Sequence, residues 1–384
     1  MPLLLNKIIK EVGDSEGGTA QQKLRIQSEA MAVRAFLNFQ LINYFAKPYN
    51  AATASADPGF PIITDPDITQ TDFKRGSVQE MYDFIIADLT AAVPNLAIQP
   101  TYATRWSQAA AEGFLGKVYL FMGKNPEALD HFNASFSAIA KMSRKPRLYD
   151  YNIELNEGGS FMPIDPVNGP RSPFTGITDQ TESVVAVFSQ AGAYDGNGPG
   201  NDFLSLPEKT VDLFDPADMR LKLYTDQTQD QEPIPGGRLR RFTIPYTFAN
   251  ARIGMELSDL YLLRAEAKAR ANDLGGAVAD VEFLRKNRMP AANAAVPSAD
   301  AVSSTTLVKF IIDERIREFA ALGYRWWDMR RLSVDPIFAG QPAAKHTLYL
   351  TGGGTEEFTL KPERLTLRIP QLYLNAHPEM PNNP

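Results

Sequence analysis

The chain has 384 residues, and its hydrophobic content of 44% is enough to bury a substantial core. Its formal net charge of -6 and isoelectric point near 5.3 argue against nucleic acid as a partner, because phosphate binding needs a basic surface that releases counterions. Cysteine is absent, which excludes disulfides, thiolate nucleophiles and cysteine-ligated metals.

The N-terminus offers no complete targeting segment. The apolar run at residues 2–5 is interrupted by Asn6 and Lys7, whereas a secretory signal has an apolar core of about 7 to 15 residues. No other apolar run approaches the ~20 residues needed to cross a bilayer. We therefore expect no membrane-spanning helix in this chain.

Residues 30–89 predict two helices joined by a long loop. Residues 30–49 predict a helix that ends at Pro48 and Tyr49. Residues 46–77 hold four prolines among Asp and Thr residues, which predicts a long ordered loop. Residues 78–89 predict a further helix.

Two segments have the same helix, turn and helix pattern. The first spans residues 111–132 and the second residues 260–284. Gly123 and Ala128 of the first correspond to Asn272 and Ala277 of the second. Small residues at these positions let paired helices approach closely, as in tetratricopeptide-type hairpins.

The stretches between these helical blocks are richer in Gly and Pro. Residues 183–188 have the β-branched content of a short buried strand. Residues 231–246 and 348–360 predict hairpins. The expected fold class is therefore mainly α, with tetratricopeptide-like helical hairpins, a loop-rich variable subdomain and minor β-strands.

Residues 313–332 combine two tryptophans with many charged side chains. A helical face is predicted by Ile312, Ile316 and Phe319, and Gly323 can end that helix. Trp326 and Trp327 then open a second short helix. Exposed charge pairs three or four residues apart stabilise a helix by only ~0.2 to 0.5 kcal/mol. The density of charged residues here therefore predicts a partly buried ionic cluster.

The C-terminal segment allows this stretch to be interpreted. It reads Leu-Arg-Ile-Pro at residues 367–370 and Asn-Ala-His-Pro-Glu-Met-Pro-Asn-Asn-Pro at residues 375–384. Together the two segments resemble the C-terminal signatures of the SusD/RagB-like family, although Trp327 replaces the family's usual aromatic residue and Tyr373 stands near a commonly acidic position. Residues 30–49, the Leu-Phe-Asp-Pro-Ala-Asp-Met-Arg at residues 213–220, and residues 256–288 extend the resemblance in the family's order.

The resemblance implies one SusD-like domain over residues 1–384. Its expected parts are a first helical repeat region at 20–145, a loop-rich insertion with short strands at 146–250, a second helical repeat region with the Trp-Trp signature at 251–334, and a C-terminal hairpin with the signature tail at 335–384. Family members begin with a signal peptide and a lipid-bearing Cys. We expect this chain to be N-terminally truncated, so that export and lipidation rest on the resemblance.

A search for enzymatic residues gives weak candidates. None of the three histidines (His131, His346 and His377) has a metal-binding neighbour at helical spacing, and no phosphate-binding loop or nucleophile elbow occurs. Glu314 and Glu318 lie one helical turn apart and could imitate a glycosidase pair, but Arg315 and Arg317 favour structural salt bridges. We expect no enzyme activity and no cofactor.

Two Asx-rich loops offer oxygen ligands of the kind that calcium prefers. They span residues 65–69 and 195–202. Neither follows the EF-hand spacing, and such loops usually satisfy their own backbone amides. We therefore expect no metal site.

The resemblance implies a binding protein. SusD-like proteins are lipoproteins of the outer-membrane surface that capture glycans or other nutrients for a SusC-like TonB-dependent transporter. Such capture needs an aromatic platform on loops, where sugar faces stack. Tyr49 and Phe60 in the first loop, with Tyr194 and Phe203 in the second, are the candidates by location.

Two alternatives remain open. The helical hairpins could form a protein-interaction scaffold or a peptide-binding surface, and the absence of Trp from the loops leaves room for a peptide ligand. A glycoside hydrolase is the third reading, and it requires two carboxylates about 5 to 10 Å apart in a cleft.

Overall fold

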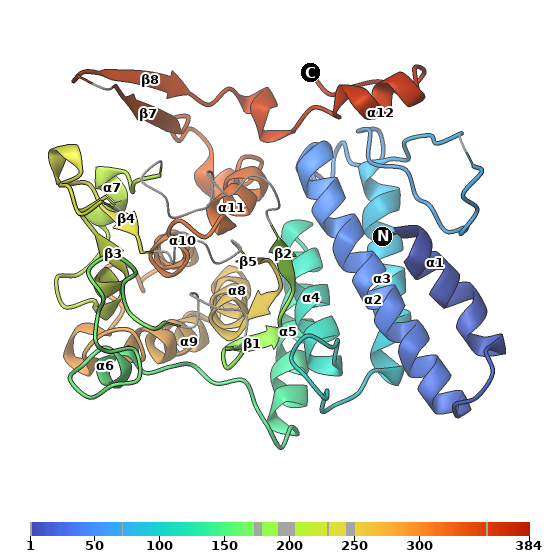
Figure 1. The fold of residues 1–384 in the computed structure, drawn as a ribbon, viewed down its shortest axis with the longest axis horizontal. Coiled ribbons are helices and arrows are strands. Elements are labelled where there is room, and N and C mark those ends of the chain that lie inside the picture. Colours follow the sequence, from blue (N-terminus) through green and yellow to red (C-terminus); the bar gives the residue numbers. More distant parts are fainter. Residues whose placement is uncertain are drawn as a thin grey trace. The chain divides into compact units, whose positions relative to one another are not determined.

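The structure is a computed structural model, which describes residues 2–70, 72–172, 179–190, 204–228, 230–242, 250–350 and 352–384. It is mainly helical, so the predicted fold class is confirmed (Figure 1). The chain groups into two compact units. Unit 1 contains residues 1–96 and 326–384, and unit 2 contains residues 97–325. The expectation of a single domain stays a prediction.

Unit 1 begins with three helices that pack in chain order. They are α1 (Pro2–Glu11), α2 (Ala20–Phe45) and α3 (Val78–Ala92). Capping boxes begin both longer helices, at Thr19 for α2 and Ser77 for α3. The buried apolar side chains between α2 and α3 include Phe36, Phe39, Ile42, Met81 and Ile85.

The C-terminal part of unit 1 contains α11 (Tyr324–Leu332, from Trp326 onward), the hairpin of β7 (Lys345–Tyr349) and β8 (Thr355–Thr359), and α12 (Gln371–Ala376). The hairpin predicted at residues 348–360 is confirmed, and its ladder begins three residues earlier. The carbonyl groups at the C-terminal end of α2 accept hydrogen bonds from this part: Leu367 N–H donates to Tyr44 and the Arg330 side chain to Ala46.

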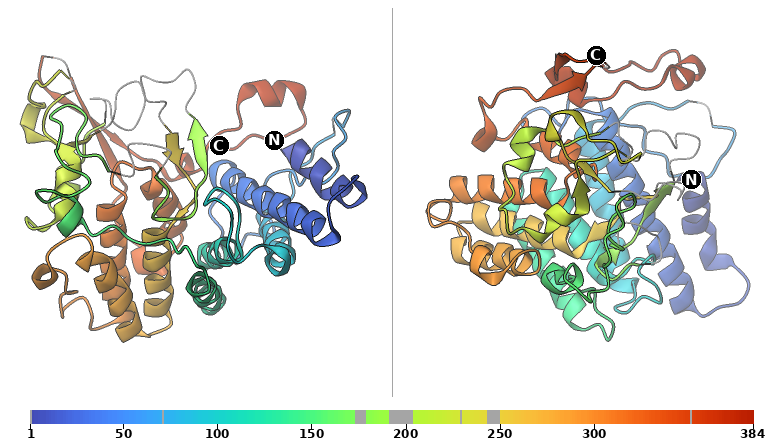
Figure 2. Two further views of the ribbon diagram at one scale, coloured as in Figure 1. Left: turned by 60° about the horizontal axis from the view of Figure 1, so that its bottom comes forward. Right: turned by 60° about the vertical axis from the view of Figure 1, so that its left-hand side comes forward.

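Unit 2 contains two antiparallel helix pairs. The first pair is α4 (Gln108–Phe121) with α5 (Asn125–Ala140), and the second is α8 (Leu257–Arg270) with α9 (Leu274–Lys286). These are the two predicted repeats. α10 (Ser304–Glu318) packs on α8, and Figure 2 shows α8, α9 and α10 alongside one another. α10 ends at Glu318, and Gly323 adopts a φ of 85° in the turn before α11.

A buried triad joins three helices of unit 2. Asp259 of α8 accepts hydrogen bonds from Lys117 of α4 at 3.0 Å and from Arg315 of α10 at 2.7 Å. Burial opposes ionisation of Asp259, but the two cations hold its pKa below the usual range. The triad therefore fixes how α4, α8 and α10 meet.

The remaining segments of unit 2 are short. They include α6 (Tyr151–Glu154), α7 (Glu208–Val211) and antiparallel pairs of short strands. The single strand predicted at residues 183–188 is instead two strands, β1 (Ser183–Val185) and β2 (Phe188–Gln190). They pair with β6 (Met255–Glu256) and β5 (Asn250–Arg252). The ladder breaks between them, where Ala186 N–H donates to the carbonyl of Ala103.

The hairpin predicted at residues 231–246 is wrong in its first strand. β4 (Arg240–Arg241) lies within that range but pairs with β3 (Tyr224–Thr225). The Pro235–Gly237 segment forms a turn of 3-10 helix instead of a strand. Proline lacks the N–H that a ladder needs, and Gly236 adopts a φ of 78°.

Candidate functional site

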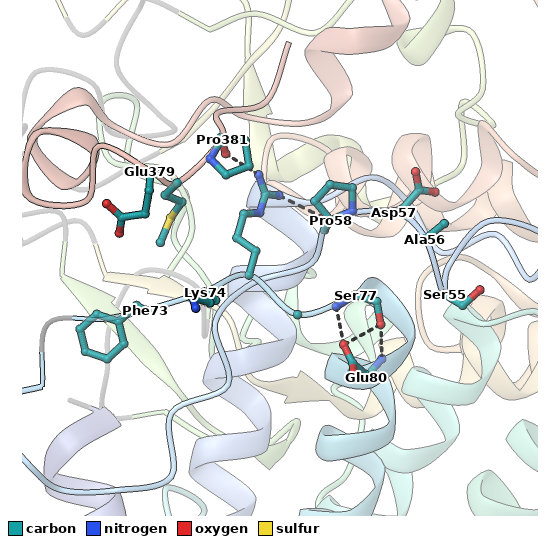
Figure 3. A pocket seen from close by; sticks show the side chains of 13 residues that line it. Ser55, Ala56, Asp57, Pro58, Phe73, Lys74, Ser77, Glu80, Glu379 and Pro381 are labelled. Atoms are coloured by element: carbon teal, nitrogen blue, oxygen red, sulfur yellow. Dashed lines mark hydrogen bonds between the residues drawn. The ribbon is translucent and has the colours of Figure 1, made fainter.

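The loop that the sequence predicted at residues 46–77 lines a pocket in unit 1 (Figure 3). Two stretches of the loop, residues 55–58 and 73–77, form most of the wall, Glu80 of α3 contributes, and residues 379–381 of the C-terminal tail complete it. The volume is about 500 Å³, within the ~300 to 1,000 Å³ typical of small-molecule sites.

Backbone contacts hold the two loop stretches together. Gly59 N–H donates to the carbonyl of Gly76 at 2.7 Å, and Val78 N–H donates to the carbonyl of Asp57 at 3.0 Å. A Cβ at Gly59 would lie 2.5 Å from the carbonyl oxygen of Ser77, so this crossing requires glycine. The loop wall is therefore built before any ligand binds.

Arg75 fastens the tail to the loop. Its guanidinium donates to the backbone carbonyls of Gly59, Pro58, Phe45 and Pro381, at distances of 2.8 to 3.1 Å. Burial lowers the pKa of Arg75, but the group stays a cation at neutral pH. A fork of five donors suits this arrangement, whereas a lysine ammonium would not.

The pocket presents apolar and charged groups side by side. Phe73 and Met380 supply the apolar surface, and Figure 3 shows Phe73 and Glu379 at one side of the pocket, away from Ser55. Lys74 is a largely exposed cation. Such a mixture can stack on the apolar face of a ligand and hydrogen-bond its polar groups.

Two of the pocket's carboxylates are already engaged. Asp57 is buried, which raises its pKa, but hydrogen bonds from Lys47 and Thr53, both at 2.6 Å, bring that pKa below the usual range. Glu80 accepts the backbone N–H and the hydroxyl of Ser77, and these bonds lower its pKa. Both groups therefore stay ionised at neutral pH and are poor general acids.

Neither described residue of the predicted platform lines this pocket. Tyr49 is 8% exposed, packs edge-on against Tyr82 and donates its hydroxyl to Gln79 at 2.6 Å. Phe60 is half-buried, with its ring 6.0 Å from that of Phe45. Tyr194 and Phe203 lie outside the described residues. The assignment of these four side chains to ligand binding stays a prediction.

The sequence analysis did not single out Phe73, which lines the pocket. Phe73 stands between two charged neighbours, Asp72 and Lys74, so no apolar periodicity marks it. Its ring lies edge-on to His377, 5.4 Å away, a tail residue that no local pattern connects to it. A lone aromatic residue within a charged stretch of loop was the available signal.

The predicted salt bridges of Glu314 and Glu318 are confirmed. Glu314 faces three arginines of unit 2, Arg220, Arg285 and Arg317, each at 2.7 Å. Burial opposes ionisation of Glu314, but these cations hold its pKa far below the usual range. Arg315, the other expected partner, pairs with Asp259 instead.

Glu318 continues the same network. It accepts from Arg220 and from Arg288, which also pairs with Glu182. Including Asp218, which accepts from Arg220, four carboxylates face four guanidinium groups in this buried cluster. A retaining or inverting glycosidase needs one carboxyl that can hold a proton, and arginines surround both Glu314 and Glu318. This pair is structural.

The metal and membrane expectations can be compared with the described part of the chain. In that part no group of three or more His, Asp or Glu residues is arranged to hold a metal ion. Asp67 accepts from the N–H and hydroxyl of Thr69, as an Asx turn does, while Asp65 pairs with Lys10. Residues 195–202 lie outside the described residues. Across the same described ranges, no helix combines the length and apolar character needed to cross a membrane.

Models of known protein families match an N-terminal and a C-terminal segment of the chain. Residues 3–120 match a family model described as starch-binding associating with outer membrane, and residues 245–384 match the model of the SusD family. No curated protein matches the chain in sequence.

Solved structures share the fold over the whole chain. A SusD superfamily protein from Bacteroides thetaiotaomicron is 20% identical, with a TM-score of 0.73, 100% of this chain covered and 83% of that one. A SusD-like carbohydrate binding protein from Bacteroides vulgatus is 17% identical, with a TM-score of 0.69 and coverages of 99% and 81%. A laminarin binding SusD-like protein is 19% identical, with a TM-score of 0.67 and coverages of 100% and 83%. With family matches at both ends and this common fold, the chain belongs to the SusD/RagB-like family.

Proposed function

We propose that this protein binds a glycan or oligosaccharide without converting it, at the bacterial outer-membrane surface, and delivers it to a SusC-like TonB-dependent transporter. The family membership carries this proposal, because residues 3–120 match a model described as starch-binding associating with outer membrane and residues 245–384 match the model of the SusD family. A structural relative that binds laminarin supports a glycan as the ligand.

The pocket in unit 1 is the proposed place of binding. Phe73 offers a ring for the C–H face of a sugar, and Lys74 and Glu379 offer hydrogen bonds to hydroxyl groups. Glu379 is exposed and therefore free to turn toward a ligand. Phe60 belongs to the same loop and extends the proposed contact region. Tyr49 anchors the loop by packing its ring against Tyr82.

Affinity electrophoresis against a panel of plant, host and microbial polysaccharides, with laminarin included, tests this proposal. We expect retardation by at least one glycan with no release of shorter sugars. Phe73→Ala should weaken the retardation, because it removes the stacking ring. Phe358→Ala is the matched control, since Phe358 is an exposed phenylalanine of unit 1 in β8, outside the pocket.

Three results would count against the proposal. Absence of retardation across the panel would favour a peptide ligand or a protein-interaction scaffold. Release of shorter sugars would show a hydrolase. Equal retardation of the Phe73→Ala and wild-type proteins would remove binding from the pocket, and Phe60→Ala and Tyr49→Phe would then test the predicted platform.

Delivery to a transporter needs a separate test. The affinity-tagged protein, expressed with its natural membrane anchor in its own bacterium, should copurify with a TonB-dependent transporter from detergent-solubilised outer membranes. Recovery of the tagged protein without any such transporter, under conditions that preserve other outer-membrane complexes, would contradict this part of the proposal.

A further inference from the structure

The C-terminal tail of unit 1 contains a loop whose two ends are held together. Ile369 N–H donates to Asn382 Oδ1 at 2.8 Å, and Asn382 Nδ2 donates back to the carbonyl oxygen of Ile369 at 3.2 Å. Next to this pair, the carbonyl oxygen of Pro381 accepts from Arg75 at 3.0 Å. A surface segment whose ends meet in this way is an Ω-loop. We call residues 370–381 the tail loop.

The tail loop is bonded mainly to itself. Across the described ranges, the hydrogen bonds of residues 371–380 all stay within the tail loop, as in the donation from Met380 N–H to the carbonyl oxygen of His377 at 3.0 Å. The loop contains α12, which has no buried residue, and Leu372 and Tyr373 of this helix are 76% and 61% exposed. Segments with few buried contacts open at low cost in free energy. The tail loop can therefore move as one body while its ends stay fixed.

Two parts of the tail loop face the pocket. Glu379 and Met380 belong to the pocket wall, and Figure 3 shows Glu379 on the same side as Phe73. The His377 ring lies edge-on to Phe73, with ring centroids 5.4 Å apart and an angle of 76° between the planes. Within the described residues this is the one aromatic contact between the tail loop and the rest of unit 1. A single ring contact shifts an equilibrium by about two- to tenfold, so it favours the observed position of the loop without locking it.

We propose that the tail loop is a lid of the pocket, with its hinge at the Ile369–Asn382 pair. The contact of His377 with Phe73 is the latch. Opening separates the two rings and widens the pocket beside Phe73, and closing retains a bound sugar. The wall formed by residues 55–58 and 73–77 stays in place, because its own backbone hydrogen bonds hold it. This inference rests on the proposed glycan binding and adds the movement that admits and retains the ligand.

A latch of this kind affects binding rates more than affinity. The ligand enters and leaves through the open lid, and the latch contact is the same in the free and the bound closed states. Removing the latch therefore raises the association and dissociation rates by the same factor and leaves Kd unchanged. A side chain that only positioned Phe73 would act differently, because its loss would weaken Kd through faster dissociation.

Spin labels can report the position of the lid. The chain has no cysteine, so Leu372→Cys in α12 and Ala91→Cys near the end of α3 give two unique attachment sites, both exposed and both in unit 1. Pulsed EPR on the full chain measures the distances between the labels, with and without laminarin or whichever panel glycan binds. We expect two populations without glycan and enrichment of one of them at saturating glycan.

Three substitutions test the latch, in the labelled protein by EPR and in the unlabelled protein by surface plasmon resonance. His377→Ala removes the latch, and should raise the population that glycan depletes, and both binding rates, about two- to tenfold. His377→Phe keeps a ring against Phe73 and should behave as wild type. Asn375→Ala is the matched control, since Asn375 is exposed on the same loop and accepts a hydrogen bond from Gln371 within it.

The lid and the proposed function can fail separately. A single distance that is identical in wild type and His377→Ala, with and without glycan, would overturn the lid and leave the proposed function standing. A weaker Kd in His377→Ala through faster dissociation alone would also overturn the latch and assign His377 to positioning Phe73. If no glycan binds but His377→Ala still shifts the distances, the movement is supported and the proposed function fails.

Discussion

Asn383 and Arg75, 308 positions apart, share one acceptor: Asn383 Nδ2 donates to the carbonyl oxygen of Phe45 at 2.8 Å, and Arg75 Nη2 donates to the same oxygen at 3.1 Å. Arg75 Nη2 also donates to Asn383 Oδ1 at 3.0 Å. The Asn-Pro tail and the pocket loop thus converge on the C-terminal end of α2, where helix carbonyls lack partners within the helix.

Arg75→Lys should loosen the tail despite keeping the charge, because one ammonium cannot reach four carbonyls that the guanidinium fork spans. We expect faster hydrogen exchange at the amides of Leu367 and Ile369, which donate to Tyr44 O and to Asn382 Oδ1. Arg144→Lys is the control, since Arg144 donates to a single carbonyl in unit 2. Unchanged exchange in Arg75→Lys would show that the tail is held without it.

Glu314→Gln should destabilise unit 2 by about 3 to 5 kcal/mol, because it leaves Arg220, Arg285 and Arg317 facing a neutral group inside the protein. Urea unfolding at pH 7 measures the loss. Glu357→Gln provides the comparison, since its pair with Lys345 is more than half exposed on both sides, and should change stability by less than about 1 kcal/mol. Equal effects of the two substitutions would refute the importance given to the buried cluster.

Glu256 should make stability depend on pH. Burial raises its pKa to about 7, against the opposing effect of Arg252. An unfolded glutamate has a pKa of about 4.3, so the folded state holds the proton more tightly. The stabilisation from this group is complete below pH ~4.3 and is lost as the pH rises through 7.

Glu256→Gln removes that titration. The free energy of unfolding of the wild type, relative to the variant, should fall by on the order of 3 kcal/mol between pH 4 and pH 8. Denaturant unfolding of both proteins across this range measures the difference. A difference that stays constant with pH would show that Glu256 does not carry the raised pKa.

Two glycine substitutions should have opposite signs. A Cβ at Gly116 of α4 would lie 2.5 Å from the ring of Phe132 on α5, so Gly116→Ala should cost about 1 to 3 kcal/mol. Gly275, in α9, has no atom within 4 Å of the corresponding position, and Gly275→Ala should stabilise by up to about 1 kcal/mol. Thermal unfolding of the two variants compares them, and a stabilised Gly116→Ala protein would contradict the close packing of α4 on α5.

The helix pairs could be predicted because their apolar residues repeat with the helical period, which is a local property of residues 111–132 and 260–284. The β3–β4 pairing could not, since the strands are two residues long and proline and glycine stand where the expected strand would begin. Short strands are specified by what they pack against and leave little pattern in the sequence.

The existence of a buried ionic cluster could be predicted from the sequence, but only some of the residues that pair within it. Arg317, three residues from Glu314, was within reach of helical spacing, whereas Arg220 lies 94 positions away. The buried state of Tyr49 likewise depends on Tyr82 of α3, which the loop sequence cannot reveal. Contacts across long sequence separations therefore set the limit of the sequence analysis at the site.

The four-by-four ionic cluster also bears on how far the insertion can vary in length. The chain leaves the cluster at Glu182 and returns to it at Asp218 and Arg220. Glu182 pairs with Arg288 and Arg220 pairs with Glu318, and Arg288 and Glu318 also pair with each other. Closing a flexible loop costs only about 0.6 kcal/mol more for each doubling of its length. Residues 183–190 pair as β1 and β2, and Leu206 and Phe214 are buried, so a grafted binding loop should replace only the chain between residues 190 and 204, with the ion pairs of Glu182 and Asp218 left intact.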